Sequence, residues 1–189
     1  MGKSASGKDT AYERLLSDPD LKLSRFIMYT TRPIRAKEED GIQYYFVKED
    51  TLRELSKQGR VIEVRSYDTV QGIWYYFTAD SDRVDLDREN YLALGTLESF
   101  QKIRDFYGRD RVVPLYIEVD NGIRLERALK RERKQNKPDY EEMCRRFLAD
   151  EQDFSEENIK KAGIIRRFSN NEDREICFQE LTEYIRDLL

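Results

Sequence analysis

The chain has 189 residues, and its 34 lysines and arginines nearly balance 38 aspartates and glutamates, for a net charge of -4. Histidine is missing from the sequence, which excludes a Ser-His-Asp triad, a Cys-His pair and a histidine-held zinc site. No run approaches the ~18–20 apolar residues of a membrane span, and the negative net charge provides no broad field for nucleic acid. The composition therefore predicts a globular domain, with neither a membrane nor a nucleic acid as partner.

Short β-rich runs alternate with segments of helical periodicity along the chain. The runs occur at Phe26–Thr31, Tyr44–Val47, Val61–Arg65, Trp74–Thr78, Tyr91–Gly95, Val112–Val119 and Ile164–Phe168. Apolar residues with helical spacing occur at Leu15–Leu16, Leu52–Leu55, Phe100–Phe106, Ile123–Leu129, Tyr140–Leu148 and Cys177–Leu188. Strands that alternate with helices predict an α/β fold with a mainly parallel sheet.

Two regions interrupt this alternation. Residues 31–78 contain short strands, turns and one helix, which indicates a small antiparallel subdomain, and residues 121–161 are nearly all helical and dense in charge. The remaining residues (1–30, 79–120 and 162–189) are predicted to form the core. The polar segment 130–138 is interpreted as a solvated helix end, with a mobile basic flap as the alternative. Cys144 and Cys177 are widely separated and indicate two reduced thiols in a cytoplasmic protein.

The chain opens with the spacing G-x-x-x-x-G-K, from Gly2 to Lys8. Small residues allow backbone N–H groups to wrap around phosphate oxygens, the lysine adds a positive charge, and the following helix directs its N-terminus at the anion. Such a match arises by chance in about one protein in twenty of this length, so the helical run at Ala11–Leu16 behind it matters. The residues predicted to bind ATP here are Gly2, Ser4, Ala5, Ser6, Gly7, Lys8, Asp9 and Thr10.

Asp9 departs from this pattern, because serine or threonine usually follows the lysine and binds Mg²⁺ directly. A carboxylate could reach Mg²⁺ through water, and Thr10 could supply a hydroxyl one residue later. The sequence therefore predicts Mg²⁺ as the cofactor, held through Asp9 or Thr10 and waters. A phosphate loop also normally follows a buried strand, whereas only Met1 precedes Gly2. We expect that residues forming such a strand have been omitted, and that restoring them raises both the melting temperature and turnover.

A second constellation is Tyr29-Thr-Thr-Arg32-Pro33-Ile-Arg35, followed by Asp40-Gly41-Ile-Gln-Tyr44-Tyr-Phe46-Val47. Two arginines three residues apart, beside a proline that restricts the backbone, can form a fork for an anionic group. Without the phosphate loop, a surface hairpin with incidental charges would be the simpler interpretation. Together with the loop, the run resembles the guanylate kinase family, in order and at near-constant spacing over essentially the whole chain.

The resemblance implies a P-loop kinase fold, in which helices flank a mainly parallel central sheet. A small antiparallel subdomain that binds the nucleoside monophosphate (NMP) and a helical lid complete this fold. The implied activity is a nucleoside monophosphate kinase of purine nucleotide metabolism in the cytoplasm, most simply one that transfers the γ-phosphate of ATP to GMP or dGMP. The implied partners are ATP and an NMP, and the implied assembly is a monomer or a homodimer.

The resemblance also implies roles for single residues on the GMP side. The residues that match those gripping the phosphate are Arg32, Arg35, Tyr44 and Tyr76. Glu63 and Thr78 match residues that face the guanine, and Thr96 belongs to the same set. However, Thr96 replaces an aspartate, Met28 replaces a base-contacting serine, and Phe77 replaces a glycine. The resemblance therefore supports phosphoryl transfer better than it supports a preference for guanine, because the loss of polar contacts to the base lowers specificity more than general affinity.

On the donor side, the resemblance implies catalytic roles for Lys8 and for arginines of the lid. Arg131 and Arg133 are both candidates for the lid arginine, and the spacing does not decide between them. Arg146 matches an arginine on the next helix, whereas Arg145 is interpreted as its solvated neighbour. Asn170 matches a residue near the adenine of ATP, although Ser169-Asn-Asn171 would also suit a plain turn.

Two alternatives stay open. One is another P-loop kinase of related fold, since the Gly-Lys-Asp sequence is also similar to phage deoxynucleoside monophosphate kinases and animal phosphomevalonate kinases, and ribose bisphosphate phosphokinases share the fold. The other is a catalytically silent guanylate-kinase-like binding module. Such modules keep the acceptor side and lose the phosphate loop, whereas Gly2, Gly7 and Lys8 are present here.

Overall fold

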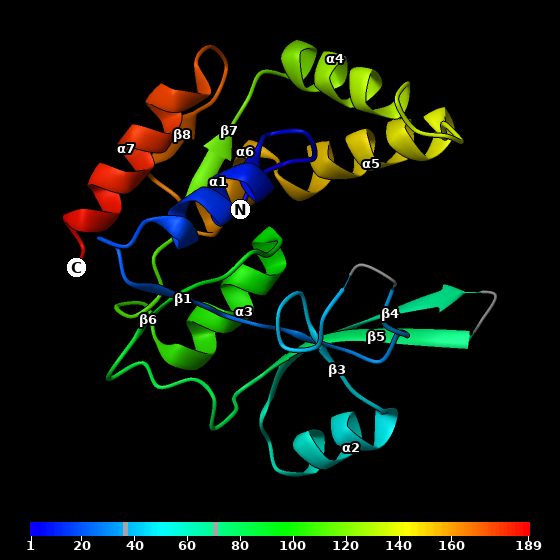
Figure 1. Cartoon of the computed structure of the whole chain (residues 1–189), viewed down its shortest axis with the longest axis vertical. Coiled ribbons are helices and arrows are strands. Elements are labelled where there is room, and N and C mark those ends of the chain that lie inside the picture. Colours follow the sequence, from blue (N-terminus) through cyan, green and yellow to red (C-terminus); the bar gives the residue numbers. More distant parts are fainter. Residues whose placement is uncertain (36–37, 70–71) are drawn as a thin grey trace. The chain divides into compact units, whose positions relative to one another are not determined.

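The computed structural model describes residues 1–35, 38–69 and 72–189 (Figure 1). It divides into two compact units. Unit 1 comprises Met1–Leu21, Leu94–Gln101 and Val113–Leu189, and unit 2 comprises Lys22–Ala93 and Lys102–Val112. Within the described residues, no helix combines the length and the apolar character needed to cross a bilayer. The divisions at residues 30/31, 78/79, 120/121 and 161/162 stay predictions.

The elements follow one another along the chain as helices and short strands. They are α1 (Lys8–Ser17), β1 (Leu23–Arg25), β2 (Tyr29–Thr30), β3 (Tyr45–Phe46), α2 (Glu49–Lys57), β4 (Val61–Thr69), β5 (Gly72–Ala79), β6 (Asn90–Leu92), α3 (Leu97–Tyr107), β7 (Tyr116–Glu118), α4 (Asn121–Glu132), α5 (Tyr140–Asp153), α6 (Glu156–Lys161), β8 (Arg167–Ser169) and α7 (Arg174–Arg186). The mixed content confirms the predicted α/β class.

Unit 1 is built around the parallel pair β7 and β8, in which Ile117 lies opposite Phe168. Met1 also bonds to the β7 segment, because its carbonyl accepts from the Ile117 N–H at 3.0 Å and its amino group donates to the Leu115 carbonyl at 2.7 Å. Helix α1 contacts α7, and α7 contacts β8. The buried apolar residues of these elements include Ala11, Leu15, Phe168, Cys177, Leu181 and Ile185. This core fixes the position where α1 begins.

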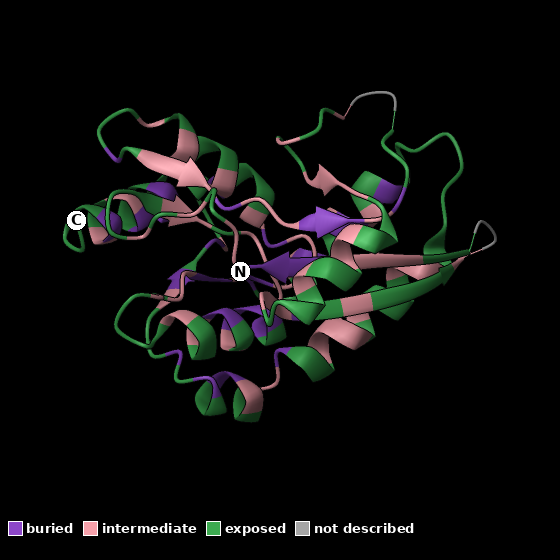
Figure 2. Ribbon diagram, turned by 90° about the horizontal axis from the view of Figure 1, so that it is seen from below, coloured by how far each residue is buried: buried purple, intermediate pink, exposed green. Residues whose placement is uncertain are grey.

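Unit 2 contains the parallel pair β1 and β6 and a four-stranded sheet of order β3-β2-β5-β4. The long β4–β5 hairpin is antiparallel, as is the β2–β5 pair, but β2 and β3 are parallel, so the sheet is mixed rather than purely antiparallel. Figure 2 shows the hairpin passing from buried at the Phe77–Ala79 end of β5 to exposed at Gly72.

The two faces of β5 have different neighbours, because side chains alternate along a strand. Tyr75, Phe77 and Ala79 pack with Tyr29 of β2 and with Leu52 and Leu55 of α2. Tyr76 and Thr78 therefore face the other side of the sheet. Phe77, which replaces a glycine of the family pattern, stacks on Tyr29 with ring centroids 5.0 Å apart and stays away from the face of Tyr76 and Thr78.

The structure corrects three sequence expectations about strands. Of the run predicted at Phe26–Thr31, only Tyr29–Thr30 (β2) is a strand, and β1 precedes this run, at Leu23–Arg25. The predicted central sheet occurs as separate parallel pairs, β1–β6 and β7–β8. The hairpin extends to Thr69 and Gly72, beyond the predicted ends at Arg65 and Trp74. Val70 and Gln71, between the two predicted strands, lie outside the described residues.

Candidate active site

The phosphate loop of unit 1 has a backbone that requires its glycines. Gly7 has φ 87°, a left-handed conformation that favours glycine, and a Cβ at this residue would lie 2.6 Å from Asn170 Nδ2. A Cβ on Gly2 would lie 2.7 Å from the Ile117 carbonyl oxygen. Lys8 follows Gly7 as the first residue of α1. The loop thus ends at a helix N-terminus, where free N–H groups and the helix dipole favour an anion.

Asp9 and Thr10 occupy the first turn of α1. The Asp9 side chain is largely exposed, and its Oδ1 lies 3.8 Å from Lys8 Nζ. Thr10 is exposed and lines a cavity beside the loop. Among the residues that the structure describes, no three or more aspartates, glutamates or cysteines gather into a metal cage.

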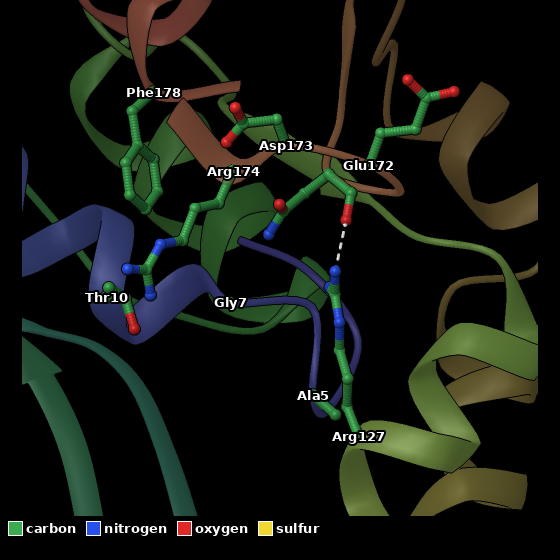
Figure 3. Close-up of a pocket in the computed structure, with 9 residues that line it drawn as sticks. Ala5, Gly7, Thr10, Arg127, Glu172, Asp173, Arg174 and Phe178 are labelled. Carbon is green, nitrogen blue, oxygen red and sulfur yellow. Dashed lines mark hydrogen bonds between the residues drawn. The ribbon is translucent and has the colours of Figure 1, made fainter. Parts of the chain in front are cut away.

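A cavity of about 490 Å³ adjoins the loop (Figure 3). Its lining residues are Ala5, Gly7, Thr10, Arg127, Asn170, Glu172, Asp173, Arg174 and Phe178. The Asn170 side chain donates from Nδ2 to the Ser6 carbonyl at 2.8 Å, so it holds the loop. The backbone carbonyl of Asn170 accepts from Arg127 Nη2 at 3.0 Å, drawn as the dashed line in Figure 3.

Sequence reasoning missed Arg127 and Arg174, which bring two positive charges to this cavity. Figure 3 shows the Arg174 side chain reaching from the start of α7 toward Thr10. A signal for Arg127 did exist, because it lies four residues before Arg131 and shares its helix face. Arg174 follows the polar turn after β8, and nothing in that turn distinguishes it from a solvated arginine.

A second cavity of unit 1, of about 250 Å³, brings the loop together with the predicted lid. It is lined by Ser4, Ala128, Arg131, Glu132, Gln135, Asp139, Glu142, Met143, Arg146 and Phe147. Arg131 and Arg146 therefore share one cavity with Ser4. Arg133 is the C-cap residue of α4 and is exposed. It is not among the described residues that line these two cavities. The geometry favours Arg131 over Arg133 as the lid arginine.

Glu142 organises the arginines of α5. Arg146 donates from Nε to Glu142 Oε1 at 2.6 Å, and Arg145 donates from Nε and Nη2 to the same carboxylate at 2.6 and 2.8 Å. These bonds lower the pKa of Glu142 to about 2, with the bond from Arg145 as the largest cause. The side chain of Arg145 is 65% exposed and does not line the cavity, which agrees with its interpretation as a solvated neighbour.

Beside the loop lies a charge cluster around one buried arginine, which the sequence did not reveal. Arg124 is 1% exposed and donates from Nη1 to the Ser4 carbonyl at 3.2 Å and from Nη2 to Glu151 Oε1 at 2.7 Å. The Ser4 N–H donates to Asp150 Oδ2 at 2.7 Å, and Lys3 Nζ donates to Glu151 Oε1 at 2.9 Å. The cluster ties the loop to both α4 and α5.

On the acceptor side, in unit 2, Arg32 is buried and already paired. It is 4% exposed, and its Nη1 and Nη2 donate to the two carboxylate oxygens of Glu38 at 2.7 and 2.6 Å. Hydrogen bonding from Arg32 lowers the pKa of Glu38 from the ordinary 4.5 to about 2. The backbone N–H of Arg35, whose side chain is exposed, donates to Glu38 Oε2 at 2.9 Å. Glu38 is thus a central residue of this site that sequence reasoning missed.

Two tyrosines flank this arginine. The Arg32 guanidinium lies 5.5 Å from the ring centroid of Tyr44, and the Tyr44 and Tyr76 rings meet edge to face at 5.6 Å. Burial raises the pKa of Tyr44 above its ordinary value of 10, so its hydroxyl is neutral at physiological pH. Arg32, Tyr44 and Tyr76, which the sequence predicts to hold one phosphate, are brought together within unit 2.

Glu63 and Thr78 are also brought together. Both are buried, and Thr78 Oγ1 donates to Glu63 Oε1 at 3.1 Å. Arg65, on the same face of β4, approaches Glu63 within 3.4 Å and was not predicted. Thr96 lies in unit 1 instead, where its hydroxyl accepts from the Ser99 N–H at 3.2 Å and caps the start of α3.

Comparison with known proteins agrees with these observations. The family model described as guanylate kinase matches residues 1–160. The chain belongs to the guanylate kinase family. Guanylate kinase from Porphyromonas gingivalis is 32% identical over 116 residues, which are 60% of each chain. Guanylate kinase from Streptococcus mutans is 38% identical over 66 residues, 35% of this chain and 31% of that protein.

Among solved structures, the guanylate kinase of Anaplasma phagocytophilum matches with a TM-score of 0.61 and 21% identity. The match covers 98% of this chain and 82% of that one, and it confirms the guanylate kinase fold. By contrast, the aligned segments span less than two thirds of the lengths of the two curated relatives. The resemblance seen in the sequence is confirmed, and the roles of the single residues stay predictions.

Proposed function

We propose that this guanylate kinase family member transfers the γ-phosphate of ATP to GMP or dGMP, giving ADP and the nucleoside diphosphate. The observation that carries the proposal is the presence, in one chain, of two anion-binding arrangements: Lys8 behind a glycine loop at a helix N-terminus, and Arg32 beside two tyrosines. Phosphoryl transfer is catalysed mainly by alignment and charge neutralisation, and these are the groups it needs.

On the donor side, the loop N–H groups and Lys8 hold the phosphates of ATP, and the 490 Å³ cavity with Arg127 and Asn170 accommodates the rest of the nucleotide. Arg131 and Arg146, which line the second cavity with Ser4, neutralise the transferring phosphoryl group. The attacking oxygen of the monophosphate is already anionic, so the reaction needs no histidine as a general base.

Asp9 and Thr10 fit a magnesium ion that arrives with ATP. Mg²⁺ usually binds proteins through only one or two side-chain ligands, and substrate phosphates and waters complete its coordination. The exposed Asp9 carboxylate and the Thr10 hydroxyl provide such a set at the start of α1. The bound ion supplies neutralisation of the charge on the β- and γ-phosphates.

On the acceptor side, Arg32, Arg35, Tyr44 and Tyr76 hold the phosphate of GMP, and Glu63 and Thr78 face the base. The Glu38 carboxylate occupies the Arg32 fork and keeps this guanidinium oriented in the absence of substrate. The phosphate of the acceptor then competes with Glu38 for the same donors. A cytoplasmic location and a monomeric or homodimeric assembly stay predictions.

The test is a steady-state assay of ADP formation from ATP and Mg²⁺ with GMP, dGMP, AMP, CMP, UMP and a non-nucleotide phosphate such as phosphomevalonate. We expect GMP and dGMP to give the highest kcat/KM. Preference for another acceptor would assign the chain to the related P-loop kinases. Binding of GMP without turnover on any acceptor, and without ATP binding in a titration, would indicate a silent binding module.

A further inference from the structure

One face of the β4–β5 hairpin carries a carboxylate and a guanidinium side by side. Glu63 pairs with Thr78 and Arg65 pairs with Tyr76 in the antiparallel register, so these four side chains share a face. Glu63 is 8% exposed and the Arg65 side chain is 26% exposed. Arg65 therefore lies at the more accessible edge of the predicted base pocket, next to the residue that the sequence assigns to the guanine.

The contact between these groups leaves donors of the arginine available. Arg65 Nη2 lies 3.4 Å from Glu63 Oε1, and Arg65 Nε lies 3.4 Å from Glu63 Oε2. Charge-assisted hydrogen bonds are usually about 2.7–2.9 Å long, and Arg32 reaches Glu38 at 2.6 and 2.7 Å. Moreover, the buried Arg65 Nε has no hydrogen-bond acceptor among the residues that the structure describes. Charge attraction thus holds Arg65 near Glu63, and the arginine keeps N–H groups that can donate hydrogen bonds to a ligand.

A carboxylate beside a guanidinium presents hydrogen-bond acceptors next to donors. The edge of guanine is complementary, since it carries the N1–H and N2–H₂ donors next to the O6 acceptor. Adenine carries an amino group in place of O6, which would set a donor against the donors of Arg65. Met28, where the family has a base-contacting serine, offers no N–H or O–H group to a carbonyl oxygen.

We propose that Arg65 is a specificity-determining residue that donates to O6 of guanine while Glu63 accepts from N1–H and N2–H₂. This inference rests on the proposed function and adds a residue to it. Thr78 supports the arrangement, because its hydroxyl bond to Glu63 Oε1 orients the carboxylate. Arg65 then supplies the donor that Met28 lacks.

The test compares three ligands by calorimetric titration of the full chain. GMP has all three groups, 6-thioguanosine 5′-monophosphate replaces O6 by a weakly accepting sulfur, and inosine 5′-monophosphate keeps O6 but lacks the amino group. We expect the unaltered protein to bind GMP about tenfold more tightly than the thio analogue, the worth of one charge-assisted bond. In Arg65→Ala, the ratio of the affinity for GMP to that for the thio analogue should fall to near one. The ratio of the affinity for GMP to that for inosine 5′-monophosphate should stay unchanged.

Two variants serve as controls. Arg65→Lys keeps a donor and is expected to retain part of the preference for GMP over the thio analogue. Arg53→Ala removes an exposed arginine of α2 in the same unit and is expected to leave both ratios unchanged. A GMP-to-thio ratio that is equal in Arg65→Ala and the unaltered protein overturns the role of Arg65 alone. Failure of the unaltered protein to bind any nucleoside monophosphate overturns the proposed function, and this inference with it.

Discussion

Lys8 is the first residue of α1, directly after a glycine in the left-handed conformation. Its ammonium group adds a full charge to the N–H groups of the loop, and a single contact of this kind to a transition state is worth about 10²-fold in rate. We therefore predict that Lys8→Ala lowers kcat by roughly 10²-fold or more. Lys160→Ala, on the exposed face of α6, is the matched control and should leave kcat unchanged. Unchanged turnover in Lys8→Ala would remove Lys8 from the mechanism.

Glu38 makes the acceptor side sensitive to acid. Its pKa in the folded protein is about 2, below the ordinary 4.5, because Arg32 donates two hydrogen bonds to its carboxylate. A group with a lowered folded pKa stabilises the fold above its unfolded pKa, and this stabilisation is lost as the pH falls toward the folded value. The contribution of Glu38 should therefore be complete at pH 7 and should disappear between about pH 4.5 and pH 2.

The measurement is the melting temperature of the unaltered protein and of Glu38→Gln across this pH range. The variant should melt at a lower temperature at pH 7, and the difference should shrink toward zero near pH 2. Glu39→Gln changes the same charge at the neighbouring exposed position and keeps the Arg32 pair. A difference between Glu38→Gln and the unaltered protein that does not vary with pH would show that the ion pair does not stabilise the fold.

Sequence reasoning worked best for backbone positions that depend on local spacing. Gly2, Gly7 and Lys8 follow from the loop pattern, and the structure shows the steric reason for both glycines. Glu38, Arg65 and Arg124 were not predicted as site residues. The importance of each depends on its ion-pair partner and on how far it is buried, and neither can be read from a charged residue in the sequence. The family resemblance predicts that Asn170 lies near the nucleotide, but its hydrogen bond to Ser6 could not be predicted, because the two residues are 164 positions apart in the sequence.

At the scale of the elements, α4 and α5 decide which arginine can serve as the lid arginine. Arg131 lines the cavity that also contains Ser4 and Arg146, whereas Arg133 lies at the exposed end of α4. We predict that Arg131→Ala lowers kcat at least tenfold, as removal of a charge contact to the transferring group should. Arg133→Ala, measured in the same assay, should stay within about twofold of the unaltered enzyme. The reverse order would assign the role to Arg133.

Arg124 ties these helices to the phosphate loop. It is fully buried with Asp150, Glu151 and the Ser4 carbonyl as partners, and its guanidinium lies 4.6 Å from the Phe147 ring centroid. Removing one member of a buried ion-pair network leaves the other charges uncompensated and costs about 3–5 kcal/mol. Arg124→Ala should therefore lower the free energy of unfolding in urea by about 3 kcal/mol.

Arg145→Ala is the matched control, because Arg145 is largely exposed and pairs with Glu142 at the surface. Its effect on the free energy of unfolding should remain within about 0.5 kcal/mol. A loss of stability in Arg124→Ala as small as that of the control would mean that the buried cluster does not hold the loop and the helices together.

Helices were predicted more reliably than strands. Apolar spacing marked α2, α3, α4, α5 and α7, because apolar side chains recur on one face of each helix. The strand ends were missed for two physical reasons. The outer part of β4, at Ser66–Asp68, is exposed on both faces, so it lacks the alternation that marks a strand. Strand β1 contains Leu23, Ser24 and Arg25, whose pairing with β6 depends on a partner far away in the sequence.

For the whole molecule, the chain passes repeatedly between the two units. Residues 94–101 belong to unit 1, although the residues before and after them in the sequence belong to unit 2. Which unit a segment belongs to depends on contacts between residues far apart in the sequence, and these cannot be predicted from periodicity or composition. The sequence did predict the α/β class and the family, because both are carried by the order of local motifs.

In the proposed function, a phosphate held by the Lys8 loop is transferred to an acceptor held by Arg32. Rapid quenching of a reaction with γ-labelled ATP, Mg²⁺ and GMP tests this most directly. We predict that the label appears in GDP, at a rate that falls strongly in both Lys8→Ala and Arg32→Ala. Label that appears in inorganic phosphate at a rate independent of GMP, or transfer to GMP that neither substitution slows, would contradict it.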